Sequence, residues 1–223
     1  MNRLTLHVAA VDHRVELRPL VDGADLLATA FPDGPGMDPR HLPTLAATAE
    51  PHEARLAEAE CMEICCGALY VTITRTPTEV RWHGWRDPDR PGLSLPTLRF
   101  LATHYDAELA RAVGDFSWEW PARTIARHLE PALRDATAWL TRWECDTPTL
   151  ATSPATPTQL DLLFFHRPTG HAGAPWLQFR RALPLAAPET LYADLTTTDP
   201  RAGAEVVGGS AEFAERLGYP WLW

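Results

Sequence analysis

The sequence predicts an α+β protein in which a mostly antiparallel sheet is packed by tryptophan-rich helices. Apolar and polar residues alternate in segments such as 4–8, 69–73 and 80–85, which is the pattern of half-buried strands. Apolar residues recur every three or four positions from Ile125 to Trp143, which is the pattern of one helix face. Short turns between successive strand segments favour antiparallel pairing.

The first elements are predicted to be a hairpin and a short helix. Segments 4–8 and 15–20 alternate on either side of a turn at 10–12. A helix is expected over 24–30. The next segment, 31–44, contains six prolines and glycines, so it is predicted to be a loop that is long enough to act as a lid.

A second hairpin is the clearest element. Residues 68–75 and 80–85 alternate around a Thr-Pro-Thr turn, so one face of this hairpin is aliphatic. The other face is predicted to carry Tyr70, Arg81, His83 and Trp85. Two interpretations stay open: this face lies under a helix, or it binds an anionic or planar ligand through its rings and guanidinium group.

Helices are predicted to follow a strand at 98–100. The first should open with a capping box at Thr103, which has an aspartate three residues further on. A second helix is expected from Trp118 to Trp143. It should kink at Pro131, because a proline inside a helix removes one hydrogen bond.

Three regions are expected along the chain. Residues 1–146 should form the main α+β domain, and the Thr- and Pro-rich segment 147–158 a linker or surface crossing. About sixty-five residues with two strands are marginal alone, so residues 159–223 are expected to complete the main sheet and pack on the same core. This region should contribute a β-hairpin, formed by strands at 160–166 and 176–185, and helices at 188–196, 201–207 and 211–217.

Composition excludes several functions. All twenty basic residues are arginine, which rules out a Schiff-base lysine and a P-loop lysine. Codon bias or escape from lysine modification would each explain this. The net charge of −9 opposes a nucleic-acid partner, because phosphate binding depends on cationic clusters. No segment has the pattern of a signal peptide or a membrane span, so no membrane partner and a cytoplasmic location are expected.

Cys61, Cys65 and Cys66 are the strongest candidates for chemistry. These thiols, with glutamates and His52 nearby in the sequence, could bind zinc, which takes four nitrogen, sulfur or oxygen ligands. The spacing lacks the Cys-x-x-Cys pair of a zinc finger, so another part of the chain would have to complete the site. Neighbouring carboxylates disfavour a thiolate. Simple packing of the thiols in a turn and thiol chemistry remain the alternatives.

Glu119 and His83 are candidates for acid–base catalysis. Trp118 and Trp120 flank Glu119, and an apolar setting suits a carboxyl group that donates a proton. The same sequence also fits an N-terminal helix cap in which Glu119 faces the helix dipole. His83 is a candidate because histidine changes charge near neutral pH.

Three segments carry a resemblance to known sequences: CCGALYVTI at 65–73, SWEWPAR at 117–123 and AERLGYPW at 214–221. Together with the composition, they resemble an uncharacterised group of actinobacterial cytoplasmic proteins. This resemblance implies no activity, fold or site, so the functional expectation comes from the residues alone.

The absence of a catalytic signature predicts a non-catalytic intracellular binding protein for a partner protein or a small molecule. One alternative is a zinc-supported enzyme or zinc-stabilised protein that uses the cysteine cluster. The other is an acid–base enzyme that uses Glu119 or His83.

Overall fold

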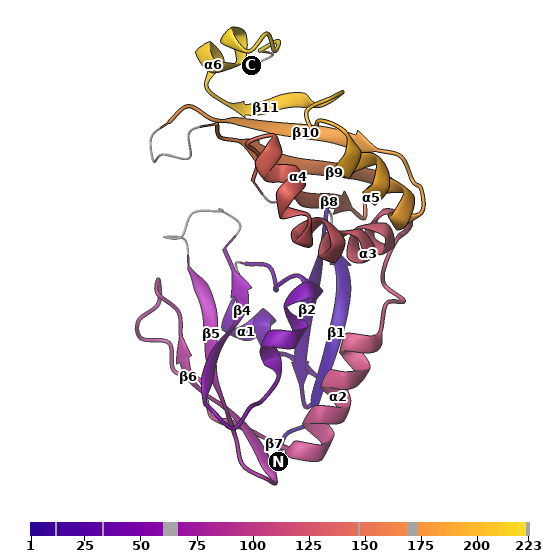
Figure 1. Cartoon of the computed structure of the whole chain (residues 1–223). Coiled ribbons are helices and arrows are strands. Elements are labelled where there is room, and N and C mark those ends of the chain that lie inside the picture. Colours follow the sequence, from indigo (N-terminus) through magenta and orange to yellow (C-terminus); the bar gives the residue numbers. More distant parts are fainter. Residues whose placement is uncertain (12, 33, 60–66, 147, 169–173, 222–223) are drawn as a thin grey trace. The chain divides into compact units, whose positions relative to one another are not determined.

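The computed structural model describes residues 1–11, 13–32, 34–59, 67–146, 148–168 and 174–221. These residues form helices and antiparallel sheets, which confirms the α+β class (Figure 1). The chain divides into two compact units, unit 1 (Met1–Trp118) and unit 2 (Glu119–Trp223). Each unit has its own hydrophobic core.

In the described part of unit 1, the strands form two antiparallel sheets. The first contains, in order, β1 (Leu4–Val11), β2 (Arg14–Val21) and β3 (Ala24–Asp25). The second contains, in order, β4 (His52–Glu58), β5 (Ala68–Arg75), β6 (Glu79–Arg86) and β7 (Leu98–Leu101). The helices are α1 (Leu26–Ala30), the 3-10 helix η1 (Pro39–Leu45) and α2 (Ala102–Gly114), which runs beside β1 (Figure 1). Both predicted hairpins are confirmed.

The segment that was expected to be a lid is part of the framework of unit 1. Residues 35–37 lie between the two sheets. The N–H of Leu17 in β2 donates to the carbonyl of Met37 (2.7 Å), and the N–H of Met37 donates to Leu56 in β4 (3.1 Å). The glycines and prolines correctly predicted irregular backbone. Backbone hydrogen bonds to β2 and β4 nevertheless hold this segment in place, as they would hold a strand.

Strand β4 was not predicted, because its sequence is rich in glutamate. Glu53 and Arg55 are exposed, whereas Ala54 and Leu56 are each 2% exposed, so residues 53–56 alternate as a sheet requires. The predicted capping box of α2 is wrong. Leu101 is the N-cap residue and makes no side-chain hydrogen bond to the helix.

Aromatic packing and a hydrogen-bond chain hold the core of unit 1. Trp82 is fully buried, and its ring makes edge contacts with Phe100 (5.5 Å between centroids) and Tyr105 (6.3 Å). The Trp82 indole N–H donates to the Tyr105 hydroxyl (3.2 Å), which donates to the carbonyl of Leu45 (2.6 Å). These two hydrogen bonds connect β6, α2 and η1 across the core.

Unit 2 has a sheet of its own, with the order β11–β10–β9–β8. Its elements are α3 (Pro121–Asp135), α4 (Thr137–Arg142), β8 (Thr149–Ser153), β9 (Thr156–His166), β10 (Leu177–Leu183), α5 (Pro188–Thr197), β11 (Glu205–Gly209) and α6 (Ala211–Arg216). The C-terminal strands therefore do not complete the first sheet, contrary to the prediction. Helices α3 and α4 belong to this unit, and their apolar side chains complete its hydrophobic core. Residues 159–223 alone would lack these side chains.

Three other elements of unit 2 also differ from the prediction. The segment 147–158, which was expected to be a linker, contains β8 and the start of β9. Where one helix was predicted up to Trp143, the structure has two: α3, which contains Pro131 and has Ala136 as its C-cap residue (φ −81°, ψ 42°), and α4. The helix predicted over 201–207 is replaced by β11, where Val206 pairs with Phe179 and is 5% exposed. Burial of a β-branched side chain against a neighbouring strand outweighs a weak local preference for helix.

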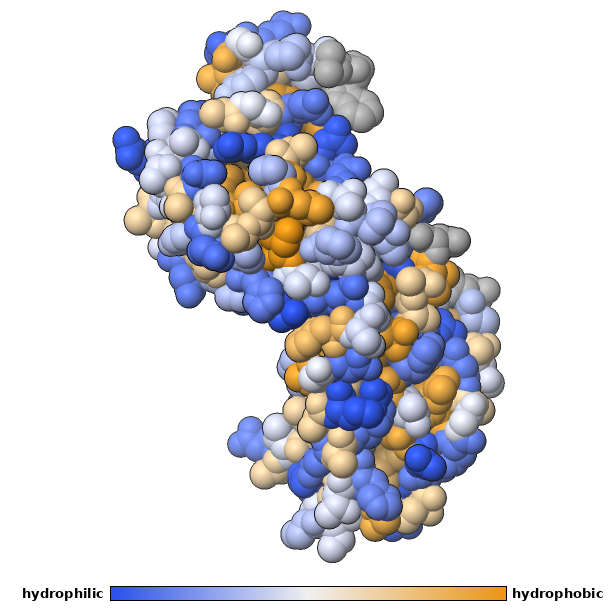
Figure 2. Space-filling view, turned by 90° about the vertical axis from the view of Figure 1, so that its right-hand side faces the viewer, coloured by the Kyte–Doolittle hydropathy of each residue, from blue (hydrophilic) through white to orange (hydrophobic). Residues whose placement is uncertain are grey.

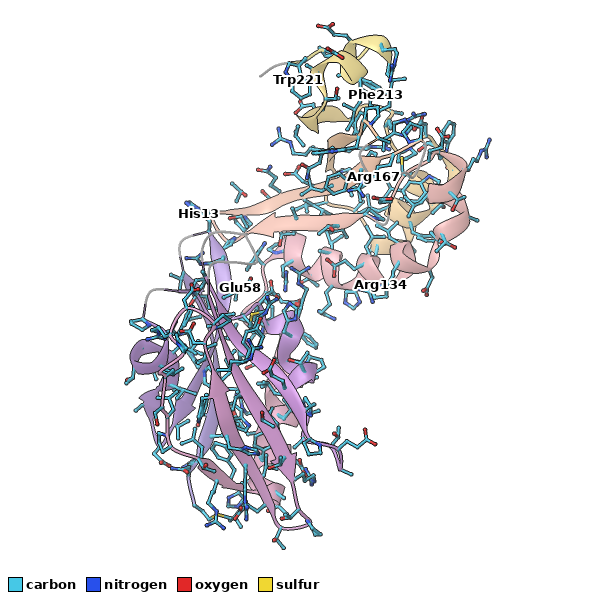
Figure 3. The ribbon with its side chains drawn as sticks, turned by 90° about the vertical axis from the view of Figure 1, so that its left-hand side faces the viewer. His13, Glu58, Arg134, Arg167, Phe213 and Trp221 are labelled. Atoms are coloured by element: carbon cyan, nitrogen blue, oxygen red, sulfur yellow. The ribbon has the colours of Figure 1, made fainter. Side chains whose placement is uncertain are left out.

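The aromatic C-terminal segment packs on the core of unit 2. Tyr219 makes an edge contact with Phe179 (4.9 Å), and Trp221 lies against the same core. Phe213 and Trp221 lie at the same end of unit 2 (Figure 3). Hydrophilic and hydrophobic residues are interspersed on the face that Figure 2 shows. No helix in the described residues is long and apolar enough to cross a bilayer.

Candidate functional site

The structure places Tyr70, Arg81 and His83 on one outward face of the second sheet of unit 1. His83 pairs with Thr72 across the β5–β6 hairpin, and Arg81 pairs with the next outward residue of β5, Thr74. Directly paired residues share a face, so these side chains project in the same direction. Of the four residues predicted for this face, three are therefore together.

Trp85 does not belong to this face. A bulge at Gly84, whose φ is +60°, inserts one extra residue into β6 and reverses the alternation beyond it. The Trp85 ring therefore packs beside Trp82, with 6.4 Å between centroids. Arg86 takes the outward position, and its guanidinium carbon lies 3.9 Å from the centre of the Tyr70 ring.

Two arginines lie directly opposite each other on the same face. Arg81 of β6 pairs with Arg99 of β7. Like charges at directly paired positions repel, and Glu79 offsets this repulsion. Its carboxylate accepts from the Nε of Arg81 and from the Nε of Arg99 (3.0 Å). We call the outward set of Tyr70, Arg81, His83, Arg86 and Arg99 the arginine face.

The Glu79 carboxylate is buried, whereas the arginines that it holds are exposed. Its side chain is 9% exposed, compared with 48% for Arg81 and 56% for Arg99. Hydrogen bonds from Arg99 and Arg81 lower the pKa of Glu79 to about 2. Two guanidinium groups thus share one carboxylate that is ionised at neutral pH, and this trio then carries one net positive charge.

Arg86 is balanced more closely. It binds the carboxylate of Glu53 through two hydrogen bonds (3.0 and 2.6 Å), and the hydrogen bond from Arg86 lowers the pKa of Glu53. The surplus positive charge of the arginine face therefore lies at Arg81 and Arg99.

Acid is expected to weaken unit 1 through Glu79. Because the folded-state pKa (about 2) is below the ordinary value of 4.5, the stabilisation is present above pH 4.5 and is lost as the pH falls towards 2. Replacing Glu79 with glutamine should therefore reduce the loss of stability in this range. Urea midpoints measured at stepwise lower pH check this. The exposed Glu50, replaced in the same way, is the control, and equal pH dependence in both variants would contradict the assignment.

Glu119 is tied into the first turn of α3. Its side chain is 2% exposed, and its two oxygens accept from Arg127 (2.8 Å) and Thr124 (3.1 Å). Arg123, four residues after Glu119, is also buried (7% exposed). A carboxylate with both oxygens engaged in this way anchors the helix start through side chains, but it is not the predicted cap, because Trp120 is the N-cap residue and makes no side-chain cap hydrogen bond.

Cys61, Cys65 and Cys66 lie outside the described residues, so the zinc hypothesis stays a prediction. Among the residues that the structure describes, no three potential metal-binding side chains come together. Cys145 is buried, its thiol donates to the carbonyl of Trp143 (3.3 Å), and burial raises its pKa to about 12. This thiol stays protonated at neutral pH and does not suit a nucleophile.

A buried histidine network in unit 2 was missed, because its members are far apart in the sequence. His166 is 2% exposed. Its Nδ1 lies 3.2 Å from the carbonyl of Trp143 and therefore carries the hydrogen, which leaves Nε2 to face Arg201 (3.4 Å). Asp199 holds the guanidinium of Arg201 through two oxygens. Burial and the charge of Arg201 lower the pKa of His166.

Comparison with protein families, with curated proteins and with solved structures finds no match for this chain.

Proposed function

We propose that the protein is a non-catalytic binding protein whose arginine face holds an acidic segment of a partner protein. The observation that carries this proposal is the pair of half-exposed arginines, Arg81 and Arg99, held next to each other by the buried carboxylate of Glu79. Guanidinium groups bind carboxylates in a planar, two-point geometry, and they bind best when their positions are set in advance.

Electrostatics favours an anionic partner. The chain carries a net charge of −9, yet the trio of Arg81, Glu79 and Arg99 carries one positive charge. A second carboxylate at this place would relieve the repulsion between two directly paired cations. The same complementarity would steer an acidic segment to this part of an otherwise acidic protein.

The shape of the face favours a protein over a small molecule. Outward side chains of β5, β6 and β7 form it, and Arg81, Arg86 and Arg99 are all about half exposed. Small-molecule sites are concave and surround most of the ligand, whereas protein interfaces are broad. Tyrosine and arginine are also the residue types that dominate binding energy at such interfaces.

Binding of a fluorescently labelled oligoglutamate peptide tests the proposal. At low ionic strength we expect the intact protein to bind it, with an affinity that falls as salt is added. Replacing Arg81 and Arg99 together with glutamine should weaken binding about tenfold or more, since each charge-assisted pair is worth roughly 1.5–3 kcal/mol. Fluorescence anisotropy gives the affinity.

Arg180 provides the matched control. It is 47% exposed and pairs with Glu205 in unit 2, so its replacement with glutamine removes an arginine of similar exposure from elsewhere. This variant should bind like the unmodified protein. Equal affinity of the double variant and the unmodified protein, or no binding at low salt, would refute the proposal.

A further inference from the structure

We infer that unit 1 also contains a binding pocket for a small organic anion that has an apolar body. The pocket is open, has a volume of about 580 Å³ and lies on the outer side of the β1–β2 hairpin. Its volume is within the range of about 300–1,000 Å³ typical of small-molecule sites. Its described lining comes from residues 7–35, so it is separate from the arginine face.

A row of alternating charges forms the bottom of the pocket. Glu16 of β2 has a side chain that is 5% exposed, and it accepts from Arg14 (3.1 Å), Arg18 (3.2 Å) and the N–H of Gly36 (3.2 Å). Arg18 also binds Asp25 (2.9 Å). A buried carboxylate thus sets the positions of two guanidinium groups, as second-layer carboxylates do in anion sites.

The negative charges in this row are already engaged. The remaining oxygen of Asp25 accepts from the N–H groups of Leu27 and Ala28 at the start of α1 (2.9 and 3.2 Å). Of the four charged side chains, Arg14 is the most exposed, at 43% compared with 30% for Asp25, 21% for Arg18 and 5% for Glu16. The charge most accessible to a ligand is therefore a guanidinium, which favours an anionic head group.

Apart from the four charged side chains and His7, the lining of the pocket is apolar. Two prolines, Pro32 and Pro35, and aliphatic side chains surround the charges; the aliphatic residues are Ala9, Val11 and Leu20. Apolar walls contribute affinity in proportion to the ligand surface that they cover, whereas a few charged groups fix its orientation. The ligand should therefore combine an anionic head with an apolar body.

The wall formed by the segment after α1 is fixed before a ligand arrives. The N–H of Glu58 at the end of β4 donates to Pro35 (3.2 Å), and the Gly36 N–H donates to Glu16. A side chain at position 36 would collide with the carbonyl of Leu17, so the close approach requires glycine. His13, next to Arg14, and Glu58 lie at the same end of unit 1 (Figure 3). A preformed wall lowers the entropic cost of binding.

Phenyl phosphate is the probe for this inference, with uncharged benzyl alcohol and inorganic phosphate as its two partial analogues. In two-dimensional NMR spectra of the full chain, we expect phenyl phosphate to shift the amide signals of Gly34 and Gly36 in a saturable way. Each partial analogue should bind about tenfold more weakly, because it lacks either the head or the body. Equal binding of all three would overturn the inference.

Two variants separate charge from shape. Arg14→Gln should weaken binding of phenyl phosphate about tenfold, while Arg18 and Gly36 continue to hold Glu16. Ala9→Trp should fill the pocket and abolish binding without a change of charge.

The control is Arg3→Gln, which replaces an exposed arginine of unit 1 outside the pocket. This variant should bind like the unmodified protein. Binding that persists in both pocket variants, or no shift with millimolar probe, would overturn the inference. Neither result would affect the arginine face.

Discussion

Replacing Trp82 with alanine is expected to lower the free energy of unfolding of unit 1 by about 3–5 kcal/mol. The side chain is fully buried, and its ring contacts Phe100 and Tyr105. Alanine would leave a large cavity between β6 and α2 and would remove the donor to the Tyr105 hydroxyl. Since domains are stable by only about 5–15 kcal/mol, this loss is large enough to threaten folding. Urea denaturation followed by circular dichroism measures it.

Tyr105→Phe is the graded companion to this variant. It keeps the ring but removes the hydroxyl that accepts from Trp82 and donates to Leu45. Two buried polar groups would lose their partner, which should cost about 1–3 kcal/mol. If Trp82→Ala cost less than Tyr105→Phe, packing of the indole ring would not be the main contribution, and our account of this core would be wrong.

Unit 2 is expected to lose stability as the pH falls below about 6.5, the ordinary pKa of histidine. Burial, followed by the charge of Arg201, lowers the pKa of His166 in the folded state. At a pH between the folded and the ordinary value, the unfolded chain therefore binds more protons at this residue than the folded chain. The stabilisation is present above pH 6.5 and is lost as the pH falls through the folded-state value.

His166→Asn should flatten this dependence. The asparagine amide can still donate to the carbonyl of Trp143, but it does not titrate. It should also lower stability at neutral pH by about 1–3 kcal/mol, because the ring stacked on Phe213 is lost. Denaturation midpoints measured from neutral pH down to about pH 5 provide the comparison. His104, exposed on α2, is the control position, and a wild-type slope in His166→Asn would contradict the assignment.

Local pattern was sufficient for elements in which neighbouring residues decide the structure. The hairpins β1–β2 and β5–β6 have strict alternation around short turns, and the structure contains both. Helix α6 lies within the predicted segment 211–217 and begins after Ser210, whose hydroxyl accepts from the N–H of Phe213 (3.3 Å). In these cases the information lies within a few residues of the element.

The candidate site shows where local pattern was insufficient. Tyr70, Arg81 and His83 were placed on one face because period-two alternation is reliable within a regular strand. Trp85 was misplaced because one extra residue at Gly84 reverses that alternation. A glycine inside a strand is a known sign of a bulge, so this signal was present but was not used. Arg99 was missed because its pairing with Arg81 joins two distant segments.

The sequence by itself therefore determined the α+β class, most of the helices and strands, and the outward direction of much of the arginine face. Only the tertiary structure decided that α3 and α4 join the C-terminal strands in a unit of their own, and that Val206 lies in a strand. It also decided that Glu79 holds Arg99, and that His166 meets Arg201. The physical reason is the sequence separation of the interacting residues. Alternation and capping act over a few residues, whereas burial and ion pairing depend on which distant segments become neighbours.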